Sequence, residues 1–156
     1  MVCLQRQATG QGYCKIIGCA MKMHNTLGNG FQEVIYQRCL AIELRKIARE
    51  FAREQEQIIY YKGEEVSTRR SDFIVEGNIM VEIKALINLE DVHLAQAKNN
   101  VVAYDLPVGL LINFGAASLP YKKVFNSKHN SQQKNPLIPK ILIQTICNRL
   151  NLIQTT

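Results

Sequence analysis

Long apolar runs are absent from this sequence of 156 residues. A membrane-spanning helix needs roughly 18–20 consecutive apolar residues, and no stretch of the chain approaches that length. Residues 1–12 include polar residues where a signal peptide would carry an apolar stretch, so we expect a soluble, cytoplasmic protein. The low hydrophobicity of a disordered protein is also missing, since 47% of the residues are hydrophobic, and one ordinary globular domain is expected.

Cysteine pairs with metal-site or disulfide spacing are absent as well. The five cysteines are an odd number, and none of them forms a CxxC motif. This pattern suggests neither a zinc site nor a disulfide framework, and it is typical of free thiols in a reducing cytoplasm. They are Cys3, Cys14, Cys19, Cys39 and Cys147.

Acidic residues are missing from the last third of the chain. Residues 1–105 contain 13 basic and 13 acidic side chains, whereas residues 106–156 contain six basic and no acidic ones. A basic, acid-free segment is attracted to phosphate backbones through counterion release, but it is also a common solvated surface, and both interpretations stay open. The six basic residues are Lys122, Lys123, Lys128, Lys134, Lys140 and Arg149.

Two helices are predicted in the first third of the chain. Residues 14–26 have apolar side chains at helical spacing, and the glycines of residues 27–30 then interrupt the pattern. A second helix is expected from there to about Phe51. Its apolar stripe, projected back toward its start, passes through Tyr36 and Glu33, so a carboxylate lies on the buried side of the helix. The stripe consists of Leu40, Leu44, Ile47 and Phe51.

The remaining pattern predicts a three-layer α/β domain. Strand-like segments separated by turn signals predict an antiparallel meander, followed by a helical crossover, a buried strand and an edge strand. The mixed sheet should place the buried strand parallel to one strand of the meander, with the helices of residues 14–51 covering one face. The meander spans 57–61, 65–75 and 79–83, the crossover helix 90–104, the buried strand 108–114, and the edge strand 121–125.

Three ionisable residues end the central hairpin of this meander, Asp72 on one strand and Glu82 and Lys84 on the other. Glu82 and Lys84 point to the same face, because side chains alternate along a strand. Whether Asp72 joins them depends on the turn. A three-residue loop at 76–78 sets Asp72 opposite Glu82, whereas a two-residue turn sets it opposite Ile83. A shared site therefore predicts an odd-length loop or a bulge.

Buried charges at the end of an apolar hairpin need partners, because leaving them unpaired is costly. A divalent cation is one suitable partner, since hard cations such as Mg²⁺ prefer carboxylate and carbonyl oxygens. Lys84 is placed to hold an attacking water and to stabilise charge on a scissile phosphate. The alternative is a salt-bridged strand end, which is the more frequent origin of an Asp, a Glu and a Lys near one another.

Residues 30–36, Gly-Phe-Gln-Glu-Val-Ile-Tyr, resemble the motif that names the GxxExxY family, which is assigned to the PD-(D/E)XK nuclease superfamily. The resemblance extends over about residues 14–125, and it implies a restriction-endonuclease-like core. Other matching segments resemble the family's first helix, first hairpin, core motifs, later helix and later strand. They are 16–20 with His24 and 27–28, then 61–63, 70–72, 81–85, His93 with 95–96, and 109–115.

The resemblance implies a role for each matching residue. Asp72 and Glu82 would ligate Mg²⁺ or Mn²⁺, with the carbonyl oxygen of Ile83 as a third ligand and Lys84 as the catalytic lysine. Glu33 would be the helix-borne acid at the same cleft and a further ligand. A glutamate near a helix N-terminus is also accounted for by the helix dipole, and this alternative stays open.

Three more residues are candidates for substrate contact. Gln96 resembles the glutamine that follows the lysine motif in RecB-like members of the superfamily, and His93 precedes it on the same polar stripe. Those relatives tend to have a tyrosine four residues after the glutamine, where this chain has Asn100. Tyr36 is the third candidate, with a packing role as its alternative. For His93 the alternative is a surface or hydrogen-bonded histidine.

The sequence therefore predicts a metal-dependent nuclease that hydrolyses phosphodiester bonds in DNA or RNA. A non-catalytic nucleic-acid-binding or protein-interaction module on the same fold is the alternative. Residues 126–156 have no counterpart in the family. They are expected to form a basic polar linker and an apolar segment, which is a candidate for a partner helix, a homo-oligomer contact or a cap on the sheet.

Overall fold

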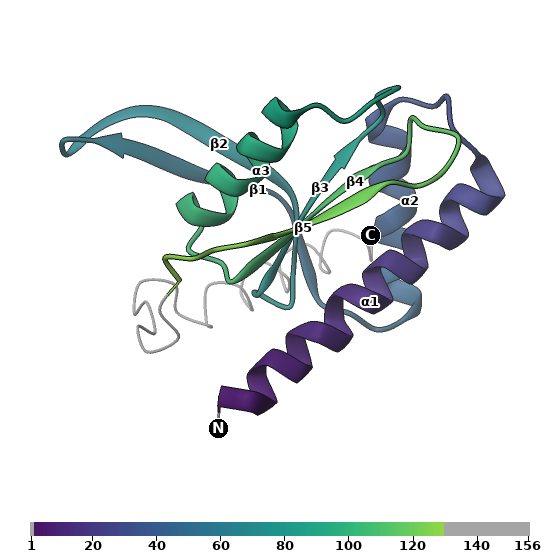
Figure 1. The fold of residues 1–156 in the computed structure, drawn as a ribbon, viewed down its shortest axis with the longest axis horizontal. Helices are drawn as coiled ribbons and strands as arrows, with labels where there is room; N and C mark the ends of the chain where they lie inside the picture. The colour runs from purple at the N-terminus through teal and green to yellow at the C-terminus, as the bar shows by residue number, and fades with distance from the viewer. Residues whose placement is uncertain (1, 130–156) are drawn as a thin grey trace, which may run out of the picture.

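The predicted hairpin is part of a five-stranded mixed sheet. The computed structural model describes the backbone of residues 2–129 and the side chains of residues 11–129. The strands lie side by side in the order in which they occur in the chain (Figure 1). They are β1 (Phe51–Tyr61), β2 (Glu64–Val75), β3 (Ile79–Lys84), β4 (Val108–Asn113) and β5 (Tyr121–Phe125).

The direction of each strand follows from its connection. Tight turns join β1 to β2 and β2 to β3, and both pairs are antiparallel. The helix α3 (Asp91–Ala103) connects β3 to β4, and these two strands are parallel. Such a pair needs a long crossover because the chain must return to the same end of the sheet. β5 then lies antiparallel on β4. The predicted meander, crossover, parallel strand and edge strand are all confirmed.

Helices cover both faces of the sheet, which makes three layers. α1 (Val2–Leu27) and α2 (Glu33–Lys46) lie on one face, and α3 lies on the other (Figure 1). Side chains of the central strands alternate between two cores, so that Phe73 and Val81 pack with α1 and α2, whereas Ile74 packs with α3. β3 and β4 are buried on both faces, which accounts for their nearly continuous apolar sequences. The predicted three-layer fold is confirmed.

The second helix is shorter than predicted, because its last apolar residue belongs to a strand. α2 ends at Lys46, and Phe51 begins β1, which was expected to start only at Gln57. The chain turns away from the helix at Ala48, whose φ of 53° is left-handed. Phe51 then packs against Phe73 with 5.7 Å between ring centroids. The helical spacing of Phe51 was therefore misleading.

The first helix is longer than predicted, since it begins at Val2 and not at residue 14. Gly12 lies inside it. A Cβ atom at this position would meet a side-chain carbon of Ile79 at 2.8 Å, so the glycine permits α1 to pass close to β3. Its role is close packing, and it does not end the helix.

The chain stays in contact with the domain after β5. The N–H of Asn126 donates to the carbonyl oxygen of Pro107 at 3.1 Å, and its side chain accepts the N–H of Lys128 at 2.9 Å. The predictions for residues 130–156, which include three of the six basic residues, lie outside the described residues. No helix between residues 2 and 129 is long and apolar enough to cross a membrane.

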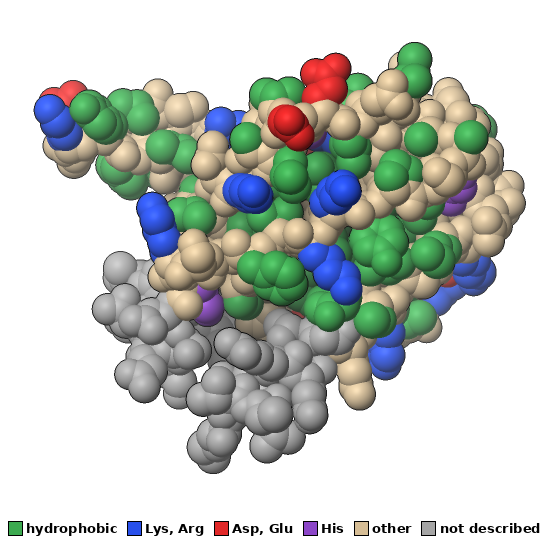
Figure 2. Space-filling view, in the orientation of Figure 1, with side chains coloured by type: hydrophobic (Ala, Val, Ile, Leu, Met, Phe, Trp, Pro, Cys, Tyr) green, Lys and Arg blue, Asp and Glu red, His purple; other side chains and the backbone are tan. Residues whose placement is uncertain are grey.

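One hairpin projects beyond the rest of the sheet (Figures 1 and 2). β1 and β2 pair along nearly their whole lengths, whereas β2 pairs with β3 only over residues 73–75. Residues 55–71, called the arm from here on, therefore continue as a two-stranded ribbon. Its base is held by Tyr104 at the end of α3, whose hydroxyl meets the carbonyl oxygens of Gln55 and Arg69, one on each strand.

Candidate active site

The turn between β2 and β3 has the odd length that a shared site requires. Val75 pairs with Ile79, which leaves a three-residue loop at 76–78. The first two loop residues, the second of which is a glycine, have left-handed φ angles of 52° and 65°. Continuing the register by one pair sets Asp72 opposite Glu82. The predicted loop length is confirmed.

Asp72 lies at a break in the sheet. On the β3 side, backbone pairing extends only as far as Phe73, the neighbour of Asp72. The Oδ2 of Asp72 accepts the N–H of Ile83 at 2.7 Å. On the β1 side, the facing residue Glu54 is not paired and has a left-handed φ of 51°. The Oδ1 of Asp72 accepts a hydrogen bond from Gln37 on α2 at 2.9 Å. The carboxylate thus occupies an opened seam between strands, and strained backbone of this kind gathers at functional sites.

Glu82 is a nearly buried carboxyl group, with 8% of its surface exposed. The side-chain amide of Asn100 on α3 donates to its Oε1 at 3.2 Å. Burial, and then the charge of Asp72, raises its pKa from 4.5 to about 7. The pKa of Asp72 is raised too, chiefly by burial, although the N–H of Ile83 opposes the shift. The charge of Asp72 therefore destabilises the ionised form of Glu82, which favours a cation between the two carboxyl groups.

A pocket of about 210 Å³ opens beside Glu82. It lies between the base of the arm, the end of β3 and the polar side of α3. Its lining brings one carboxylate together with three cationic side chains and several hydrogen-bonding groups. The residues that line it include Arg69, Arg70, Glu82, Lys84, His93, Gln96 and Asn100.

Glu33 is half-buried at the start of α2, one turn before Gln37. Its charge contributes to raising the pKa values of Asp72 and Glu82, so it acts on the same site. Among the described residues, however, no three Asp, Glu, His or Cys side chains are gathered closely enough to hold a metal ion. Glu33 is therefore a neighbour of the carboxyl pair, and its direct ligation remains a prediction.

The candidate substrate residues differ in where they lie. His93 and Gln96 both line the pocket, as a substrate contact requires. His93 also accepts the N–H of Glu90 through Nδ1 at 3.0 Å, which stabilises the start of α3. Tyr36 is fully buried, and its hydroxyl donates to the carbonyl oxygen of Gly28 at 2.8 Å. These contacts favour the packing role for Tyr36.

Asn113 supports the site and was not recognised in the sequence. It is fully buried next to Lys84 in the parallel register. Its Oδ1 accepts the N–H groups of Leu86 and Gly115 at 2.9 and 3.1 Å, and its Nδ2 donates to the carbonyl oxygen of Leu86 at 2.8 Å. The Asn113 side chain therefore holds the backbone at Leu86, just after β3, the strand that carries Lys84. Its signal was a polar residue within an apolar run.

The sequence profile of the PD-(D/E)XK nuclease superfamily matches residues 11–124. The chain belongs to this superfamily. No curated protein matches it significantly in sequence. The fold of this chain is similar to that in the crystal structure of SSO0001, with a TM-score of 0.50 and 15% sequence identity. That match covers 78% of this chain and 58% of SSO0001.

The seam is chemically suited to the divalent metal ions that PD-(D/E)XK nucleases generally use. Both carboxyl groups are hard oxygen donors, the type that Mg²⁺ and Mn²⁺ prefer. Asn100 donates to one oxygen of Glu82, and the other, Oε2, has no hydrogen-bond partner among the described residues. The residues present therefore fit a cation.

Proposed function

We propose that this protein is a metal-dependent nuclease that hydrolyses phosphodiester bonds in DNA or RNA. The proposal is carried by the buried pair of Asp72 and Glu82, whose pKa values are both raised, beside Lys84. A salt-bridged strand end would have the opposite effect, since a close cationic partner lowers the pKa of a carboxyl group. Neither carboxylate forms an ion pair with another described residue.

In this proposal Asp72, Glu82 and the carbonyl oxygen of Ile83 hold Mg²⁺ or Mn²⁺, with Glu33 as a further acid. The bound ion would supply Lewis acidity, lowering the pKa of a water molecule and offsetting charge on the phosphate. Lys84 donates hydrogen bonds to the attacking water and to the phosphate oxygen on which negative charge develops.

The pocket residues bind and orient the substrate. Arg69 and Arg70 present guanidinium groups that suit phosphate oxygens, because their donors form a planar fork. Gln96 and His93 contribute further polar contacts from α3. Asn100 acts on Glu82, which it holds in place through the 3.2 Å hydrogen bond.

The test is cleavage of labelled single- and double-stranded DNA and RNA by the purified protein in Mg²⁺, in Mn²⁺ and in EDTA. Cleavage should require metal and should be lost in Lys84→Ala. Removing a single electrostatic catalytic group typically lowers turnover by about 100- to 1,000-fold. The matched control is Lys15→Ala, which removes an exposed lysine of α1 and should leave cleavage unchanged.

Binding without cleavage in wild type and Lys84→Ala alike would overturn the proposal in favour of the non-catalytic module. Cleavage that survives Lys84→Ala would reveal a contaminating nuclease or a site elsewhere. Measuring binding in Ca²⁺ separates loss of catalysis from loss of substrate affinity.

A further inference from the structure

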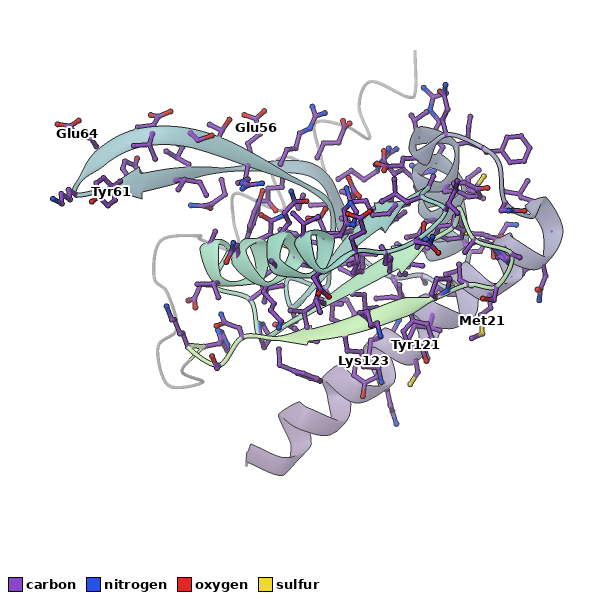
Figure 3. All side chains as sticks on the ribbon, turned by 45° about the horizontal axis from the view of Figure 1, so that its top comes forward. Met21, Glu56, Tyr61, Glu64, Tyr121 and Lys123 are labelled. Carbon is purple, nitrogen blue, oxygen red and sulfur yellow. The ribbon has the colours of Figure 1, made fainter. Side chains whose placement is uncertain are left out.

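The arm carries a strand edge that pairs with no other described strand. β2 pairs with β3 only over residues 73–75, so residues 64–71 form no backbone pairing on that side within the described part of the chain. Residues 64–70 are all exposed. Figure 3 shows Glu64 and Tyr61 at the far end of the arm. A free edge of this length is a template for pairing with another strand.

The charges along this edge change sign about its centre. Residues 64–70 read Glu-Glu-Val-Ser-Thr-Arg-Arg, with two acids at one end, two arginines at the other and Ser67 in the middle. Among the described residues, one ion pair involves any of these four charged side chains. It is a 4.0 Å contact between Arg70 and Glu54, whose side chains are both more than half exposed. A strand with this order complements an antiparallel copy of itself.

We propose that two copies of this protein pair through the free edges of their β2 strands, antiparallel and centred on Ser67. In this register Glu64 lies opposite Arg70 of the second copy, and Glu65 lies opposite Arg69. The two-fold axis repeats both contacts, so four opposite-charge pairs form. Directly opposed residues share a face, and the two kinds of pair therefore lie on opposite faces of the new sheet. The two arms become one four-stranded ribbon.

Apolar side chains of the arm support the same register. Ile58 pairs with Thr68 across the β1–β2 ladder, and Val66 of the second copy lies opposite Thr68. These side chains form one row on a single face of the ribbon. In the single chain, Ile58 is 38% exposed and Val66 is 57% exposed. A two-stranded ribbon is only marginally stable in water, and additional strands bury more of such side chains.

The charges of the arm fit self-pairing better than they fit a protected edge or a nucleic-acid surface. Charged residues on an edge strand commonly prevent pairing, but in this register unlike charges meet. A nucleic acid would require a basic surface, whereas residues 55–71 contain three acidic and three basic side chains. Arg69 and Arg70 also line the pocket, so phosphate and the second copy compete for them.

The experiment is sedimentation velocity over a range of concentrations, with protein freed of nucleic acid and with folding checked by circular dichroism. Wild type should dimerise, and Arg69→Glu/Arg70→Glu and Glu64→Arg/Glu65→Arg should each raise the dimer Kd at least about tenfold, because four attractive pairs become repulsive. Mixing these two variants should restore a heterodimer. The fourfold exchange of all four residues should restore the homodimer, since RRVSTEE is again self-complementary.

The restored pairing in the mixture and in the fourfold exchange distinguishes the arm from any other contact, because a contact elsewhere would not respond to the matching of these four charges. Wild type that stays monomeric at about 0.1 mM would overturn the proposal. So would dimers that persist in both double variants, or folded variants that do not pair when mixed. Loss of oligonucleotide binding in Arg69→Glu/Arg70→Glu with an unchanged oligomeric state would assign the edge to nucleic acid instead.

Discussion

Replacing Glu82 with glutamine should make the stability of this fold less dependent on pH. Glu82 is 8% exposed, and its pKa is raised from 4.5 to about 7. A carboxyl group with a higher pKa in the folded state binds its proton more tightly there than in the unfolded state. Its contribution to the unfolding free energy is therefore fully present below pH 4.5 and is lost as the pH rises through about 7. At about 1.4 kcal/mol for each tenfold change in proton affinity, ionised Glu82 costs about 3 kcal/mol at alkaline pH.

Urea unfolding in EDTA at about pH 5 and about pH 8.5 measures this cost. Wild type should lose roughly 2–3 kcal/mol more unfolding free energy between the two conditions than Glu82→Gln does. Asp72 is present in both proteins, so the difference reports chiefly on Glu82. Glu56→Gln, which alters an exposed residue of β1, is the matched control and should behave like wild type. Mg²⁺ at the higher pH should stabilise wild type more than Glu82→Gln.

An equal pH dependence in wild type and Glu82→Gln would refute the assignment of Glu82 as a buried acid with a raised pKa. If Mg²⁺ stabilised both proteins equally, Glu82 would not be a metal ligand. These two outcomes are independent, because the first requires only the buried carboxyl group and the second requires the cation.

Two further substitutions, the second with a glycine control, test the scaffold around the site by urea unfolding. Tyr36→Phe removes the hydroxyl that donates to the Gly28 carbonyl oxygen at 2.8 Å and should cost about 1–2 kcal/mol, whereas unchanged stability would mean that other contacts hold this turn. Gly115→Ala would place Cβ 2.4 Å from the backbone nitrogen of Leu86, so it should cost several kcal/mol or prevent folding. Gly18→Ala, where Cβ meets open space, should be neutral or slightly stabilising, and equal effects at the two glycines would contradict the close approach.

The β2–β3 hairpin could be predicted closely because two independent constraints agreed. The apolar alternation specified which face each side chain takes, and the acidic residues required Asp72 and Glu82 to be opposed. Only an odd-length loop or a bulge satisfied both, and the loop at 76–78 has three residues. Where only one constraint was available, the prediction was wrong, as for Phe51, whose helical spacing from Leu44 carried no information about the end of the helix.

Contacts between distant elements could not be predicted, because they depend on how the layers pack. Gln37 donates to Asp72 across 35 positions of the sequence, and Asn100 donates to Glu82 across 18. An amide side chain carries no sign of its partner until the helices are placed on the sheet. Neither Arg69 nor Arg70 was predicted to contact substrate, because their place in the pocket depends on how α3 packs beside the base of the arm.

The interruption of β2 at Asp72 has a consequence for local unfolding. On one side of it, β2 is buried in the body of the sheet, and on the other it is an exposed ribbon. Protection against amide hydrogen exchange follows local contact density, so the arm and the body should behave as separate cooperative units. The arm can fray and reclose while β3 and β4 keep their hydrogen bonds. Slow exchange of the amide hydrogens in the arm would then indicate that a partner is bound to the arm.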